Sequence, residues 1–156
     1  MSRTIPAVRQ AVFSALTSTA FQYVINAGAP ITIPVSSFRA GKQFVGSGTP
    51  PDPFVTIDVT DGGAVTQALP DRHVRIKVTA STAAVGGDDA VTEIIEVAIA
   101  RLRSGPEGIS LLSRAATGAT LPATIREVRN AGGLPAAFEE QSQRWYASTE
   151  FTAIAI

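Results

Sequence analysis

The stretch Asp71–Ser81, DRHVRIKVTAS, alternates apolar and polar residues and decides the fold class of this sequence. Successive side chains of a β-strand point to opposite faces, so the two sets separate in space. One face carries three β-branched residues, which are Val74, Ile76 and Val78. The other face carries three side chains able to hold positive charge, which are His73, Arg75 and Lys77. The stretch therefore predicts a strand with one buried face and one charged face.

Two further stretches also have the character of strands. Phe54–Thr60, FVTIDVT, alternates in the same way, and if it pairs antiparallel with the first strand, their polar faces coincide. Asp58 then lies near Arg75 or Lys77. The stretch Arg144–Ile156, RWYASTEFTAIAI, is partly apolar on both faces, so we expect it to be central in the sheet or covered.

Helical spacing of apolar residues appears twice. The stretch Ser2–Thr19 has this spacing, and its proline suits a first helical turn. Val85–Gly105 shows it more strongly, and we expect Asp88 or Asp89 to cap that helix, where acidic side chains favour the positive end. Its apolar stripe comprises Val91, Ile94, Ile95, Ala98, Ile99 and Leu102. Together these patterns predict an α+β fold, with a mostly antiparallel sheet of about four to six strands and two amphipathic helices packed on one face.

Two polar stretches, Arg39–Pro53 and Leu134–Gln143, have the composition of loops. The first is long for a compact domain, and long loops are often functional, so we expect an interaction loop there. Its apolar residues either fold back onto the core or dock onto another chain. The candidate interface residues of this loop are Arg39, Lys42, Phe44 and Val45.

The composition excludes several classes of function. A chain of 156 residues predicts a single domain, residues 1–156. Its 13 basic residues balance 13 acidic ones, whereas proteins that bind nucleic acid usually carry surplus positive charge. The absence of cysteine excludes disulfides and thiol nucleophiles, and the single histidine excludes a multi-histidine metal site. No apolar run approaches the ~18 residues of a membrane span, and the N-terminal stretch does not resemble a signal peptide, so we expect a soluble protein with no membrane partner.

No catalytic motif stands out. The sequence contains neither a Gly-x-Ser-x-Gly elbow nor a phosphate-binding P-loop. His73 lies on a strand beside Arg75, where a proton acceptor gains no help, so we interpret it as solvated or interfacial. Helix capping explains Asp88 and Asp89 better than metal binding does. We therefore expect no enzyme activity and no cofactor.

The positive side chains leave two interpretations open. They either contact nucleic acid or form a sheet surface that faces solvent or a neighbouring subunit. No aromatic residue is interleaved with them, which disfavours binding of single-stranded nucleic acid and favours the second interpretation. The candidate residues of this surface are Asp58, His73, Arg75, Lys77, Arg126 and Arg129.

The order of these elements resembles that of a known family. A helix is followed by PFVTIDV, by the charged strand HVRIKVTAS, by the helix DDAVTEIIEVAIARL, and after a polar spacer by RWYASTEFTAI. This order is similar to that of the tail terminator and tail completion proteins of long-tailed bacteriophages, which prophages and gene transfer agents also carry. The resemblance covers roughly Ile5–Ile154. The sequence departs from the family in the loop Arg39–Pro53 and in the spacer Gly118–Pro122, so contacts there are not transferred.

The resemblance implies a structural virion protein without enzymatic activity. Such a protein forms a homohexameric ring at the head-proximal end of the tail tube, ends tube polymerisation and joins the tail to the head. Its implied partners are further copies of itself, the major tail tube protein and the head-side connector or stopper protein, with DNA only as passing cargo in the lumen. The implied location is the tail and neck of the virion, assembled in the host cytoplasm. Two alternatives remain: a head-completion or stopper protein of the neck, and a nucleic-acid-binding module that uses residues 73–77.

Overall fold

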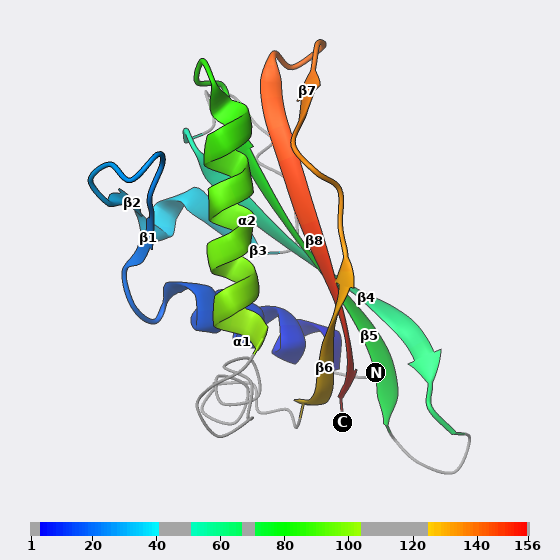
Figure 1. Ribbon diagram of the computed structural model, residues 1–156. Coiled ribbons are helices and arrows are strands. Elements are labelled where there is room, and N and C mark those ends of the chain that lie inside the picture. Colours follow the sequence, from blue (N-terminus) through cyan, green and yellow to red (C-terminus); the bar gives the residue numbers. More distant parts are fainter. Residues whose placement is uncertain (1–3, 41–50, 67–70, 104–124, 156) are drawn as a thin grey trace.

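A computed structural model of the chain describes residues 4–40, 51–66, 71–103 and 125–155. Within these ranges, the helices α1 (Thr4–Thr17) and α2 (Gly87–Arg103) pack on one face of a six-stranded sheet (Figure 1). A small hairpin of β1 (Phe21–Tyr23) and β2 (Ile31–Ile33) lies in the helix layer and contacts α2. The predicted α+β fold, with amphipathic helices on one face of a mostly antiparallel sheet, is confirmed.

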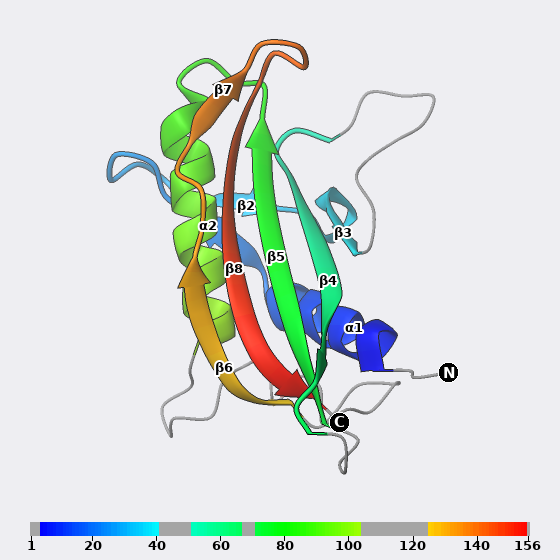
Figure 2. The ribbon, with the colours of Figure 1, turned by 90° about the vertical axis from the view of Figure 1, so that its right-hand side faces the viewer.

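The strands of the main sheet follow the order β3-β4-β5-β8-β6 (Figure 2). Their bounds are β3 Phe38–Ala40, β4 Phe54–Ala64, β5 Arg72–Thr82, β8 Arg144–Ala155 and β6 Ile125–Gly132. A further short strand, β7 (Ala137–Glu139), also pairs with β8, and the one-turn 3-10 helix η1 (Val35–Ser37) precedes β3. Among these pairings β3–β4 is parallel and the others are antiparallel. The last strand therefore lies inside the sheet, as its apolar character on both faces predicted.

The core lies between the helices and the facing side of β4, β5 and β8. The predicted strand face of β5 is fully buried there, as are Phe151 and the alanines of β8. The small alanine side chains let α2 approach β8 closely, and the helix contributes a buried stripe of its own. That stripe comprises Ala90, Val91, Ile94, Ile95, Ala98 and Leu102. Each large aliphatic side chain buried here contributes about 1.5–3 kcal/mol of transfer free energy.

Arg101, in the last turn of α2, joins that helix to the end of α1. Its guanidinium donates hydrogen bonds to the carbonyl oxygens of Leu16 at 2.9 Å, Thr19 at 3.0 Å and Ala20 at 2.5 Å. It also lies 5.0 Å from the centroid of the Phe21 ring. Carbonyl groups at a helix C-terminus lack partners within the helix and attract cations. Burial lowers the pKa of Arg101 from its usual value, but an arginine this far above neutrality stays charged.

Gly133 holds the segment between β6 and β7 against β8. A side chain at this position would collide with the carbonyl oxygen of Ser148. The close approach lets Leu134 and Ser148 exchange two backbone hydrogen bonds, each 3.1 Å long. The glycine therefore keeps the sheet continuous where β6 ends and β7 has not yet begun.

The structure corrects the predicted start of the second helix. Because α2 begins at Gly87, Asp88 and Asp89 lie within its first turn and not at the capping position. Gly86, at a φ of 70°, makes the turn into the helix, a conformation that glycine adopts without strain. The two carboxylates still lie at the positive end of the helix dipole, so the electrostatic part of the prediction holds.

The structure also corrects the predicted loops. Arg39 and Ala40 belong to β3, so the first two residues of the stretch predicted as a loop, Arg39–Pro53, form part of a short edge strand. The stretch Leu134–Gln143, predicted as a loop, contains β7, because Phe138 packs against Trp145 with ring centroids 5.4 Å apart. A hydrogen bond from the Ser142 side chain, followed by those from the backbone N–H groups of Ser142 and Gln141, lowers the pKa of Glu139 and closes the hairpin to β8.

The strand predicted over Phe54–Thr60 is longer than expected. It continues to Ala64 because β5 offers backbone partners along its whole length. A bulge at Gly62 accommodates the Asp-Gly-Gly sequence within the strand pair. The short strands β1 and β2 were not predicted, since three-residue strands carry too few alternating positions to be recognised.

We expect Arg101→Met to lower the free energy of unfolding by about 1.5–3 kcal/mol, because the carbonyls at the end of α1 lose charged donors while the apolar stem remains. Arg103→Met is the matched control, since Arg103 is exposed in the same turn and should change stability by at most about 0.5 kcal/mol. Urea denaturation followed by circular dichroism measures both variants. Equal stability of the two variants would show that Arg101 does not join the helices.

Candidate interaction surface

The face of the main sheet turned away from α1 and α2 is the candidate functional surface, and we name it the open face (Figure 2). Neither of the helices in the described ranges lies on it. Strand register brings charged and polar side chains from separate strands into rows across this face. The exposed residues of these rows are Asp58, Thr60, His73, Arg75, Lys77, Arg129, Glu150 and Thr152.

The first row joins Asp58, Lys77 and Glu150. Asp58 lies directly opposite Lys77 in the β4–β5 pair, as the alternation of the two strands predicted. On the other side, Lys77 lies directly opposite Glu150 of β8. Directly opposed side chains of antiparallel strands have Cβ atoms about 4.5–5.5 Å apart. Lys77 is therefore flanked by two carboxylates, and within the described part of the chain it makes no ion pair with either.

The second row is basic. Arg75 of β5 lies opposite Thr152 of β8, and Thr152 in turn lies opposite Arg129 of β6. Both arginine side chains are exposed. In the next row, His73 lies opposite Ile154, and Ile154 pairs on its other side with position 126. The open face is therefore basic towards the start of β5 and mixed in charge at the row of Lys77.

The other predicted interface residues have a weaker connection to the open face. Arg39, half-buried on β3, lies opposite Thr56, which places it at the edge of the open face beside the row of Asp58. Three predicted interface residues, Lys42, Phe44 and Val45, lie outside the described residues, as does the spacer Gly118–Pro122. Arg126 is placed by its backbone pairing alone, opposite Ile154.

An ion pair lies at the same end of the sheet as the basic rows. The Arg72 guanidinium lies 2.6 Å from the Asp61 carboxylate. The hydrogen bond from Arg72, together with one from the backbone N–H of Gly63, lowers the pKa of Asp61. Asp61 lies opposite the buried Val74 and Arg72 shares the side of Val74 on β5, so this pair lies on the helix side of the sheet and not on the open face.

The opposite end of the sheet contains a polar network around the buried side chain of Arg144. Arg144, at the start of β8, donates to Ser81 at 2.8 Å, reaches Asp52 at 3.3 Å and lies 4.6 Å from the Phe54 ring centroid. Asp52 also accepts hydrogen bonds from the hydroxyl of Thr82 and the backbone N–H of Ala83. Burial, and secondarily the charge of Asp52, raise the pKa of Tyr23. These contacts fasten the start of β4 to β5 and β8, which is a structural role.

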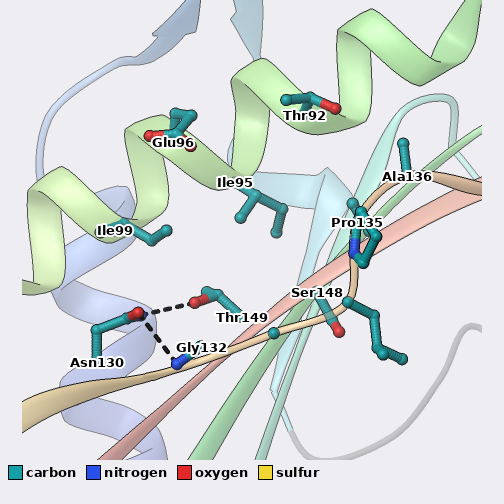
Figure 3. A pocket seen from close by; sticks show the side chains of 13 residues that line it. Thr92, Ile95, Glu96, Ile99, Asn130, Gly132, Pro135, Ala136, Ser148 and Thr149 are labelled. Atoms are coloured by element: carbon teal, nitrogen blue, oxygen red, sulfur yellow. Dashed lines mark hydrogen bonds between the residues drawn. The ribbon is translucent and has the colours of Figure 1, made fainter.

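Figure 3 shows a groove of about 340 Å³ between α2 and the chain that joins β6 to β7. Ile95 points into it from the helix, and Asn130 spans its floor. The Asn130 amide donates to the Thr149 hydroxyl at 2.8 Å and accepts from the backbone N–H of Gly132 at 3.2 Å, so its hydrogen-bonding groups are satisfied. Glu96 is the charged residue among the described lining positions. A single carboxylate beside satisfied amides and aliphatic groups does not form an acid–base pair.

A smaller hollow of about 270 Å³ lies between the end of α1 and the segment β2–β3. Its described lining consists of aliphatic, aromatic and hydroxyl side chains with no charged group.

Two other features are absent from the described residues. No three side chains of His, Cys, Asp or Glu lie close enough together there to hold a metal ion. The described helices also include none long and apolar enough to cross a membrane. The open face is therefore the strongest candidate site in the described structure.

Comparison of the sequence with models of known protein families gives no match, and comparison with curated proteins gives no match either. The role of the open face therefore has to be inferred from its own residues. Sequence reasoning missed Glu150 as a member of this face, because the last strand is partly apolar on both faces and this charged residue could not be assigned to either side. The missing information was the β5–β8 pairing, which places Glu150 beside Lys77.

We expect the protein to bind duplex DNA more weakly than about 10⁻⁴ M at physiological salt, because the carboxylates of Asp58 and Glu150 flank Lys77 and oppose phosphate. A fluorescence anisotropy titration over a series of salt concentrations measures this. Removing the two carboxylates, as Asp58→Asn with Glu150→Gln, should strengthen any residual binding. Micromolar binding by the wild type that Lys77→Ala weakens would instead identify the open face as a nucleic-acid surface.

Proposed function

We propose that this chain is a structural protein of a bacteriophage tail. In this proposal it forms a homohexameric ring at the head-proximal end of the tail tube, ends polymerisation of the tube and joins the tail to the head-side connector. It acts by contact with other proteins and performs no catalysis. Its place is the neck of the virion, after assembly in the host cytoplasm.

The observation that carries the proposal is the open face. In the described structure, the rows of Lys77 and Arg75 present exposed charges that make no ion pairs within the chain. A sheet surface with exposed charges of both signs suits recognition of another protein, because charge complementarity sets register and partner choice. The order of elements, which resembles that of the tail terminator family, supports the same proposal.

The balance of charge agrees with a DNA conduit. DNA passes through the lumen of such a ring at ejection and must not be retained there. A chain with 13 basic and 13 acidic residues has no surplus positive charge with which to hold phosphate. A ring makes a separate demand on its subunits. Each subunit needs two complementary lateral surfaces, and the rotation that relates one subunit to the next has to bring the last subunit back to the first.

Polymerisation of tail tubes in the presence of the protein tests the proposal. The tail tube protein of the same virus would be assembled with and without this chain, and tube lengths would be measured by negative-stain imaging. We expect shorter tubes with a ring of extra density at one end. A gold-tagged copy of the protein serves as the label, and it should bind at that end of the tube only.

Two outcomes would contradict the proposal. Unchanged tubes without bound gold label would exclude a tail terminator. Label that binds the isolated head connector and not the tube would instead place the protein one ring nearer the head, as a stopper.

A further inference from the structure

The outward face of α2 is acidic and lies on the opposite side of the molecule from the open face (Figure 1). Its buried stripe packs on the sheet, so the stripe on the opposite side of the helix faces away from it, and Glu96 also borders the groove beside β6. The exposed charged residues of this helix are Asp88, Asp89, Glu93 and Glu96 in its first half and the basic Arg103 at its end. Within the described part of the chain none of the four acidic residues makes an ion pair. One chain therefore carries an acidic face and a partly basic face on opposite sides.

We propose that the open face of one copy receives the outward face of α2 of the next copy, with the acidic helix lying over the basic row of Arg75 and Arg129. This inference rests on the proposed ring function and names the lateral contact by which the ring would form. The contact is head-to-tail, so each copy uses both of its faces, once as donor of the helix and once as receiver.

The spacing of the charges matches. Asp89, Glu93 and Glu96 recur at i, i+4 and i+7, so they share one stripe of the helix, and Asp89 and Glu96 are about 10.5 Å apart along its axis. Arg75 and Arg129 are separated by the intervening strand β8, and two strand spacings amount to about 9.6 Å. A helix that crosses the strands would place a carboxylate over each guanidinium group. Such charge-assisted hydrogen bonds between arginine and carboxylate are among the stronger polar contacts.

The neighbouring row restricts the position of the helix. Asp58 and Glu150 repel an acidic helix, so displacement towards the row of Lys77 is unfavourable. The same two carboxylates disfavour nucleic acid as the occupant. A twofold axis through the basic row itself would oppose arginines to arginines, which disfavours a symmetric dimer centred on that row. A second copy that offers its acidic helix fits both the attractive and the repulsive charges of the face.

Charge reversal on each face tests the contact. The open-face variant carries Arg75→Glu and Arg129→Glu, and the helix variant carries Glu93→Arg and Glu96→Arg, which lie beyond the first helical turn. We expect each variant alone to associate with itself at least ~10-fold more weakly than the wild type, with wild-type association falling as salt rises. Sedimentation velocity and mass photometry, with and without tail tubes, measure the association.

Mixing the two variants is the experiment that tests whether the two faces contact each other. In an alternating ring, the reversed open face of one variant meets the reversed helix of the other, and the remaining contacts are those of the wild type. An even-numbered ring can therefore close from an equimolar mixture, and we expect assembly to recover to the wild-type level. Glu140→Arg is the matched control, because Glu140 is exposed in the turn between β7 and β8, away from both faces, and should have no effect.

The outcomes separate this inference from the proposed function. If both variants still assemble on tubes as the wild type does, the contact is wrong although the ring stands. If the wild type neither self-associates nor binds tubes, the proposed function itself fails. If only the open-face variant is impaired and mixing does not rescue it, the open face binds a different partner, and loss of DNA binding in that variant would identify nucleic acid. Circular dichroism melting checks folding, and Gln substitutions at the same four positions replace any variant that does not fold.

Discussion

The antiparallel pairing of β5 with β8 is the constraint on which the rest of this structure depends. It runs from Arg72 opposite Ala155 to Thr82 opposite Trp145. On the helix side it places the valines and isoleucine of β5 beside Phe151 and the alanines of β8, which together form the floor of the core under α2. On the other side it assembles the charged rows of the open face. A shift of the register by one residue would exchange the two faces of β8, so burial of the core also determines which charges become neighbours.

Much of this arrangement follows from local sequence patterns. The alternation of β4 and β5 predicted that Asp58 lies near Arg75 or Lys77, because two strands with the same buried side must also share their polar side, and the register places it opposite Lys77. The helical stripes predicted both helices and the face each one buries. These predictions succeeded because periodicity is a local property that the buried side of each element imposes on its own sequence.

Other parts depend on contacts between distant segments. Glu150 and Arg129 join the open face only because β8 lies between β5 and β6, and alternation within a strand does not specify its neighbours. The hydrogen bonds from Arg101 to the end of α1 are made to the backbone carbonyls of residues 16, 19 and 20. Every residue type has such a carbonyl, so the sequence does not reveal these bonds. The strand β7 forms because Phe138 meets Trp145, a pairing that overrides the polar composition around it. The predicted loop contacts of Lys42, Phe44 and Val45 remain predictions.

The proposed head-to-tail contact makes the open face a lateral interface and not the wall of a lumen, and cysteine cross-linking tests this most directly. The chain has no cysteine, so Thr152→Cys on the open face with Thr92→Cys on α2 introduces only two thiols. Within one chain these positions are separated by the sheet, because Thr152 is exposed on the open face of β8 and α2 packs on its other face. With tail tubes and a short bis-maleimide, the proposed contact predicts a ladder of covalent multimers that ends at the ring, and monomers from either single variant. A double variant that stays monomeric, or dimers from Thr152→Cys alone, would contradict it.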